Sequence, residues 1–128
     1  MRIEMLLDNP SFSAEELKTL LDDTVTGEVE IVVADPGIMR VINRTYRHLD
    51  SSTDVLSFDL ADAPEDRPEG VIYVDGRLAP PLRAVIERVV HGWLHLCGET
   101  HDNEKDRQAM QDRVADMTAR CMTGETPC

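Results

Sequence analysis

The 128-residue chain has few cysteines, few aromatic side chains and no long apolar run. Its three cysteines are an odd number without a paired metal-binding spacing, which argues against a disulfide framework and favours a reducing compartment. The uncharged apolar runs are too short for a membrane span, and the first residues lack the features of a signal peptide. We therefore expect a cytoplasmic protein with one domain over residues 1–128.

Basic residues are also scarce, since 13 Lys and Arg stand against 25 Asp and Glu, for a net charge of −12. This balance argues against a broad nucleic-acid-binding surface, because a phosphate backbone requires local positive charge. A nucleic-acid partner would have to bind a concentrated basic patch. The densest basic cluster holds Arg40, Arg44 and Arg47, with Asn43 between them.

Segments with strand and helix periodicity alternate along the chain in a mixed α and β pattern. The expected strands cover residues 2–7, 29–34, 55–60 and 71–74. The expected helices begin at a capping box of Ser13 with Glu16, at Asp35-Pro36, near Leu82 and at Asp102 or Asn103. The residues expected on buried faces are Ile38, Val41, Ile42 and Thr45 in the second helix, Leu56, Phe58 and Leu60 in the third strand, and Met110, Val114, Met117 and Cys121 in the last helix.

Three of the four histidines lie within eleven positions, at His91, His95 and His101. Residues four apart lie one above the other on a helix, so His91 and His95 can direct ring nitrogens at a common point. Gly98 suits the position just past a helix end, where the chain can turn back and bring His101 to the same metal. Three neutral imidazoles favour one zinc ion or a similar first-row ion, with a fourth position open for water. The spacing therefore predicts a catalytic metal site.

The same His-x3-His-x2-Gly-x2-His skeleton occurs in the metzincin proteases, where a glutamate after the first histidine acts as general base. Gly92 takes that position here and cannot transfer a proton, so the sequence argues against peptidase activity. The prediction of a metal site is not affected, because it depends only on the histidines. We expect Cys97, two positions from His95, to be a buried structural thiol and not a fourth ligand. His48 has no ligand partner three or four positions away and is expected in a polar loop or at a substrate.

Two further motifs accompany the histidines, namely Asn43-Arg-Thr-Tyr-Arg47 and Thr53-Asp-Val-Leu-Ser-Phe58. The three motifs, in this order, resemble those of the bacterial YbeY family of rRNA maturation endoribonucleases. The resemblance covers about residues 29–117 in element order. The segment before it matches only in kind, as a strand followed by a helix.

The resemblance implies a single α/β (α+β) metallohydrolase domain with a small mixed sheet of about four strands, about five helices and a metal site at the end of a central helix. It implies one zinc ion on His91, His95 and His101, in an endoribonuclease that cleaves single-stranded RNA in 16S rRNA 3′-end maturation and ribosome quality control. Arg47 matches the family's active-site arginine, and a guanidinium can hold a phosphate bidentately. The implied partners are RNA, as rRNA or the 30S or 70S ribosome, with ribosomal proteins and assembly GTPases; no membrane and no DNA are expected.

Two catalytic hypotheses follow, with Arg47 and His91 as the catalytic residues. In the first, the metal lowers the pKa of its bound water or polarises a phosphoryl oxygen, while Arg47 orients the scissile phosphate. In the second, the RNA 2′-hydroxyl is the nucleophile and the metal acts only as a Lewis acid. The proton carrier is not identified, because the nearby carboxylates Asp54, Glu99 and Asp102 also suit capping or loop positions.

The chain departs from the family pattern in three places. Glu99-Thr100 stands where members usually have Tyr-Asp, so a carboxylate that could orient a histidine ligand is missing, and Glu99 could replace it only in part. Residues 69–72 replace a sequence of the Leu-Gly-Asp-Ile type, and the segment 73–90 is shorter than usual. We therefore expect a shortened helix before the helix that carries His91 and His95, and a narrower or more open cleft.

Two other interpretations stay open. A metallohydrolase of a small molecule or peptide is favoured by the metzincin-like spacing and the acidic surface, and opposed by Gly92. A non-catalytic ribosome-assembly module would use zinc only to fix its fold. A fourth protein ligand such as Cys97 would favour this module, because structural zinc is usually held by four side chains.

Overall fold

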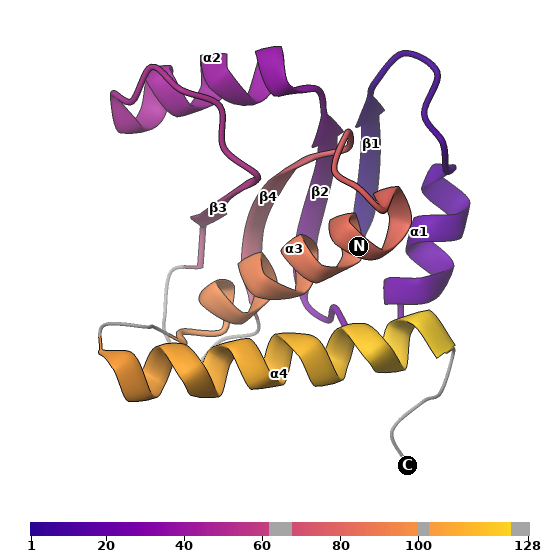
Figure 1. The fold of residues 1–128 in the computed structure, drawn as a ribbon, viewed down its shortest axis with the longest axis vertical. Coiled ribbons are helices and arrows are strands. Elements are labelled where there is room, and N and C mark those ends of the chain that lie inside the picture. Colours follow the sequence, from indigo (N-terminus) through magenta and orange to yellow (C-terminus); the bar gives the residue numbers. More distant parts are fainter. Residues whose placement is uncertain (62–67, 100–102, 124–128) are drawn as a thin grey trace.

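The computed structural model describes residues 1–61, 68–99 and 103–123 and has the expected alternation of strands and helices (Figure 1). Its elements are β1 (Arg2–Leu6), α1 (Ala14–Leu21), β2 (Glu28–Ala34), α2 (Pro36–Arg47), β3 (Val55–Asp59), β4 (Glu69–Asp75), α3 (Pro81–Leu96) and α4 (Glu104–Thr123). The described residues hold four helices, not about five. Since only residues 76–80 connect β4 to α3, there is no room for a further helix before α3, in keeping with the short 73–90 segment.

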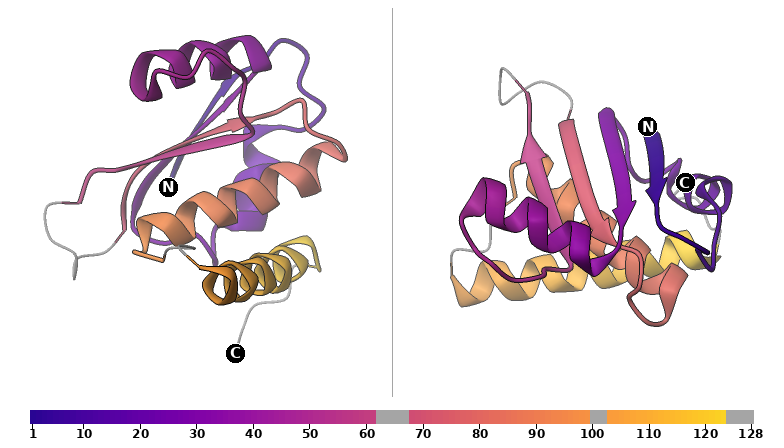
Figure 2. Two further views of the ribbon diagram at one scale, coloured as in Figure 1. Left: turned by 60° about the vertical axis from the view of Figure 1, so that its left-hand side comes forward. Right: turned by 90° about the horizontal axis from the view of Figure 1, so that it is seen from above.

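The four strands form one mixed sheet in the order β1-β2-β4-β3. β1, β2 and β4 are parallel, and the edge strand β3 runs antiparallel to β4, with Leu56 opposite Tyr73. α1 and α3 cover one face of the sheet, α4 lies outside α3, and α2 lies alone on the other face (Figure 2). This arrangement places the C-terminal ends of α2 and α3 on opposite sides of β3.

The main hydrophobic core lies between the sheet and the helices α1, α3 and α4. The alternation of apolar residues along β2 and β4 directs one set of side chains into this layer. The side chains with no solvent exposure in this core are Leu17, Leu21, Ile31, Val33, Ile72, Val74, Val85, Ile86, Val89, Val90 and Leu94. A second, smaller cluster under α2 contains Ala34, Met39 and Leu56.

Local capping explains where three of the helices begin. The Ser13 hydroxyl accepts from the Glu16 N–H at 3.0 Å and the Glu16 carboxylate accepts from the Ser13 N–H at 3.2 Å, which confirms the capping box. Asp35 caps α2 by accepting from the Ile38 N–H at 2.8 Å, and Asn103 accepts from the Asp106 N–H at the start of α4. These starts were predictable because each depends on residues within one helical turn.

The expected buried face of α2 is partly wrong. Met39 and Asn43 are buried, whereas Val41 is 49% exposed and Thr45 is also exposed. The helix is therefore rotated so that the polar side chain of Asn43, and not Val41 or Thr45, is buried. On β3, Leu56 is buried as expected, but Leu60 lies beyond the end of the strand and is exposed.

The last helix packs as predicted, with Met110, Val114 and Cys121 buried and Met117 partly buried against the core. Thr118 is also buried on this face. None of the helices in the described part combines the length and the apolar character that a membrane crossing requires.

Candidate metal and phosphate site

His91 and His95 lie one turn apart on α3, with their Nε2 atoms 3.1 Å apart and their rings at 72° to each other. Two imidazole nitrogens bound to one zinc ion at about 2.0–2.1 Å, at a tetrahedral angle, lie roughly 3.3 Å from each other. The two side chains are thus close to the separation that one divalent ion imposes on its ligands. The donor set is also suitable, because neutral imidazole is a common zinc ligand.

The chain turns sharply at the end of α3, where Gly98 has φ +95°. The Gly98 N–H donates to the His95 carbonyl at 3.0 Å and the Glu99 N–H to the Leu94 carbonyl at 3.1 Å, which are the paired bonds of a Schellman motif. The left-handed conformation that was expected at Gly98 is therefore confirmed. A Cβ at this position would meet no atom within 4 Å, so the backbone conformation alone favours glycine.

This turn also places the Glu99 carbonyl oxygen 3.1 Å from Nδ1 of His95. Because a carbonyl oxygen can only accept, we assign the proton of a neutral His95 ring to Nδ1. The Nε2 lone pair of His95 then faces Nε2 of His91, 3.1 Å away. A second partner of this kind is typical of histidines that bind metals.

A cavity of about 480 Å³ opens beside the two histidines. It lies where the C-terminal end of α2, the edge strand β3 and the second half of α3 meet. The lining residues are Arg47, Val55, Ser57, Asp59, His91, Gly92, His95 and Leu96. The structure thus brings Arg47 from α2 to the same cavity as His91 and His95 from α3.

Sequence reasoning missed Ser57 and Asp59 as site residues. Val55, Ser57 and Asp59 alternate along β3 with Leu56 and Phe58, which face α2. The period of two in the strand was the available signal, since it directs the two polar side chains to the other face of the sheet. Without the position of α3, that face could not be identified as the face of a cavity.

Gly92 has a packing role that the sequence alone did not reveal. A Cβ at this position would lie 3.0 Å from Cγ2 of Ile72 and 3.5 Å from Cγ2 of Val55. The glycine lets α3 approach the sheet closely at the point where the cavity forms. The Cβ of a metzincin-like glutamate here would press on Ile72 of β4, which would have to shift by a few tenths of an ångström to admit it.

The other predicted site residues have different outcomes. Asp54 forms an ion pair with Arg88 at 3.3 Å and does not line the cavity. Glu99 forms an ion pair with Arg113 of α4. Thr100, His101 and Asp102 lie outside the described residues. Within the ranges that are described, no group of three or more His, Cys, Asp or Glu side chains is close enough to hold a metal.

Cys97 is exposed, so the prediction of a buried thiol is wrong. As the C-terminal cap of α3, it is the first residue beyond the apolar face of that helix. Desolvation by the neighbouring protein surface still raises the pKa of the thiol, while the charge of Arg113 lowers it to a smaller extent. His48 is exposed and ends α2 in a left-handed conformation, with φ 60°.

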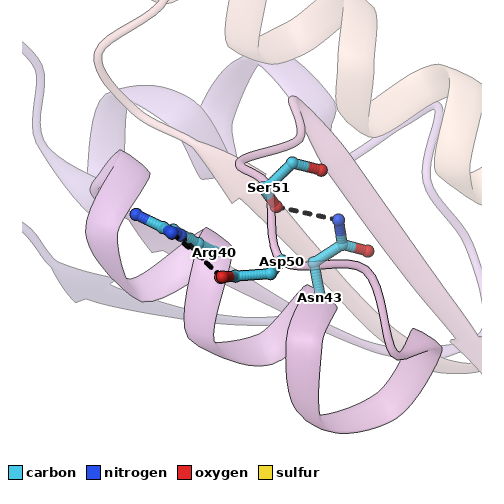
Figure 3. A network of polar contacts seen from close by, with 4 residues as sticks. All are labelled: Arg40, Asn43, Asp50 and Ser51. Atoms are coloured by element: carbon cyan, nitrogen blue, oxygen red, sulfur yellow. Dashed lines mark hydrogen bonds and ion pairs between the residues drawn. The ribbon is translucent and has the colours of Figure 1, made fainter.

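A polar network fixes the loop after α2, which leads into β3 (Figure 3). Arg40 donates from Nε and Nη2 to the two carboxylate oxygens of Asp50, at 2.7 and 3.1 Å. The Arg40 guanidinium thereby lowers the pKa of the Asp50 carboxyl below its ordinary value. The buried Asn43 amide donates to the Ser51 carbonyl at 2.9 Å. These contacts hold the loop that connects Arg47, at the end of α2, to the cavity-lining strand β3.

We expect Asn43→Ala to lower the free energy of unfolding by about 1–3 kcal/mol, because the Ser51 carbonyl loses its partner in a partly buried position. Urea unfolding followed by circular dichroism measures this change. Thr45→Ala, at an exposed position of the same helix, is the control and should change stability by less than about 0.5 kcal/mol. Equal stability of the Asn43→Ala and wild-type proteins would show that the loop is held by other contacts.

Comparison with known proteins identifies sequence relatives that are described as endoribonuclease YbeY. The family model described as endoribonuclease YbeY matches residues 8–82, which include Arg47 and the lining residues of β3 but end before the histidines. The endoribonuclease YbeY of Carboxydothermus hydrogenoformans is 34% identical over 104 residues, covering 74% of this chain and 73% of the relative. That of Nitratiruptor sp. is 29% identical over 119 residues, covering 84% and 81%. A solution structure from Thermotoga maritima has the same fold, with a TM-score of 0.62, 20% identity and coverage of 95% of this chain and 90% of the other.

Proposed function

The chain belongs to the endoribonuclease YbeY family, and on that premise we propose that it is a zinc-dependent endoribonuclease that cleaves single-stranded RNA. We further propose 16S rRNA 3′-end maturation and ribosome quality control as its cellular role. The observation that carries the proposal is the shared cavity, where an arginine from α2 meets a histidine pair from α3. A guanidinium that can bind a phosphate and imidazoles that can bind a metal are together suited to phosphodiester hydrolysis.

His91 and His95 would hold one zinc ion together with His101. The fit is supported by the 3.1 Å separation of the two Nε2 atoms and by the hydrogen bond that occupies Nδ1 of His95. When bound, the ion would supply a Lewis acid for an oxygen of the substrate or of water. His91 is a catalytic residue in this proposal because it would hold that ion next to the scissile phosphate.

Arg47 would bind and orient the scissile phosphate. Its guanidinium presents a planar set of donors that matches two phosphoryl oxygens. As the negative charge on these oxygens grows during the reaction, the interaction strengthens. This difference between ground state and transition state is what would make Arg47 catalytic and not only a binding residue.

Asp59 is the one carboxylate among the described residues that line the cavity, and we propose it as a proton carrier. Its Oδ1 accepts a hydrogen bond from the Ala61 N–H at 2.9 Å, which orients the side chain at the end of β3. Asp59 is better placed for this role than Asp54 and Glu99, which form ion pairs with Arg88 and Arg113. The nucleophile, water or the RNA 2′-hydroxyl, is left open by this assignment.

The size of the cavity favours single-stranded substrates. At about 480 Å³ it is in the range of pockets for small ligands, so it can receive part of a nucleotide that is out of a helical stack. Arg44 and Arg47 supply positive charge at the C-terminal end of α2, while Arg40 is already paired with Asp50. A local basic patch of this kind would let a chain of net charge −12 bind RNA. From the family resemblance we also propose that the protein acts in the cytoplasm. Its proposed partners there are the ribosome, ribosomal proteins and assembly GTPases.

Cleavage of one labelled RNA, offered as a single strand and as a duplex with its complement, tests the proposed function. We expect cleavage of the single strand only, loss of cleavage after a chelator removes the metal, and recovery when zinc is added back. Cleavage of both forms at one rate, or full activity in protein that metal analysis shows to be metal-free, would contradict the proposal. Binding of the RNA without cleavage would favour the non-catalytic assembly module.

A further inference from the structure

Glu99 and Arg113 form an ion pair that joins the end of α3 to α4. The Glu99 side chain is 30% exposed, and its Oε2 atom is buried without a hydrogen-bond partner among the described residues. A partly buried carboxylate is costly unless a positive charge compensates it. Arg113 therefore restrains the Glu99 side chain, which cannot turn toward water without giving up this pairing.

The backbone of the same residue contacts the histidine site. The Glu99 carbonyl accepts from Nδ1 of His95 at 3.1 Å, and the turn at Gly98 makes this approach possible. Two contacts, one from the side chain and one from the main chain, thus meet at Glu99. Together they form a continuous path from Arg113 through Glu99 to His95.

α4 provides a fixed base for this path. Arg113 lies beside Val114 and one turn after Met110, which are both buried in the main core. The position of the Arg113 backbone is therefore set by core packing, and its side chain reaches the loop from a rigid element. Rigid support of this kind keeps a metal ligand in one orientation.

We propose that Arg113 and Glu99 are positioning residues that hold His95 in the tautomer and ring orientation required for metal binding. The inference rests on the proposed function, because it assumes that His95 is a metal ligand. Partners that fix a ligating histidine typically change metal affinity by about tenfold to a hundredfold when they are removed. In this chain the Glu99 carbonyl, positioned by the ion pair with Arg113, would orient His95.

Three variants test this proposal. Arg113→Ala and Glu99→Ala each remove the ion pair, and Arg120→Ala removes a comparable exposed pair with Asp116 on the same helix. Zinc affinity is measured by competition with a chromophoric chelator, and the tautomer of His95 is read from the ¹⁵N shifts of its ring in metal-free protein. We expect zinc binding weaker by up to about tenfold in the first two variants, the lower end of the range because the Glu99 carbonyl itself remains, with a mixture of ring tautomers, and wild-type values in Arg120→Ala.

The conservative variant Arg113→Lys keeps a positive charge and should retain most of the zinc affinity. It also covers the case in which Arg113→Ala fails to fold. Wild-type affinity and a single His95 tautomer in Arg113→Ala and Glu99→Ala, even with lower stability in urea, would overturn the positioning role and leave the proposed function intact. A wild-type protein that binds no zinc would overturn both proposals.

Discussion

Replacing Arg47 by alanine should lower the rate of RNA cleavage by about a hundredfold to a thousandfold, as the loss of one preorganised charge-stabilising group does in other enzymes. Metal content should be unchanged, because Arg47 lies on α2 and the histidine pair on α3. The fold should also be kept, since Arg47 is an exposed residue and such substitutions change stability by less than about 0.5 kcal/mol. The cleavage rate under single-turnover conditions, together with metal analysis, measures both effects.

Arg44→Ala is the matched control, because it removes the same charge from the same helix at a position that does not line the cavity. It should weaken RNA binding slightly and reduce the dependence of binding on salt, with a much smaller effect on the cleavage step. If both variants lose activity equally, Arg47 contributes only general electrostatic attraction. If Arg47→Ala cleaves at the wild-type rate, its assigned role at the phosphate is wrong.

Replacing His95 by alanine should abolish both zinc binding and RNA cleavage. The substitution removes one of the two converging Nε2 ligand atoms. It also removes the ring that is oriented by its hydrogen bond to the Glu99 carbonyl. The remaining imidazoles would hold zinc too weakly to keep it during purification. Metal analysis of the purified protein and the cleavage assay are the two measurements.

His48→Ala is the control for this variant, because His48 is an exposed histidine at the end of α2 and does not line the cavity. It should keep its zinc and its activity. A His95→Ala protein that retains one zinc ion per chain and cleaves RNA at the wild-type rate would show that the metal is held elsewhere. Retained zinc with lost cleavage would instead assign His95 a direct part in the chemistry.

Local sequence patterns predicted most of the fold correctly. The capping box at Ser13, the Asp35 cap and the left-handed Gly98 were read from residues within a few positions, because the hydrogen bonds that they make are local. The i, i+4 spacing of His91 and His95 likewise predicted two convergent rings, since one helical turn sets their separation. Patterns of this kind do not depend on how the elements pack.

The errors and omissions concern contacts between distant segments. The burial of Asn43 was not predicted, because it depends on the loop after α2, which brings the Ser51 carbonyl to the Asn43 amide. Cys97 was expected to be buried, but α3 ends at Leu96. Cys97 is the cap after the last helical turn, and it is exposed. Asp59 was overlooked because only the packing of α3 against β3 turns its side of the strand into a cavity wall.

The meeting of Arg47 with the histidines could be expected only from the family resemblance. Periodicity places Arg47 at the end of one helix and His91 within another, and it contains no information on their distance. The sheet order β1-β2-β4-β3 makes β3 an edge strand, and that edge is where α2 and α3 approach one cavity. The role of Arg113 is not visible in the sequence for the same reason, since the contact with Glu99 depends on how α4 packs.

The most direct test of the proposed function is cleavage of a labelled single-stranded RNA from the 3′ region of 16S rRNA by untagged protein. His91→Ala, purified in parallel, controls for contaminating nucleases because it should lack the metal and keep the fold. Cleavage by the wild type and none by His91→Ala is the predicted result. Equal cleavage by both proteins, or none by a wild type that contains zinc, would contradict a metal-dependent ribonuclease.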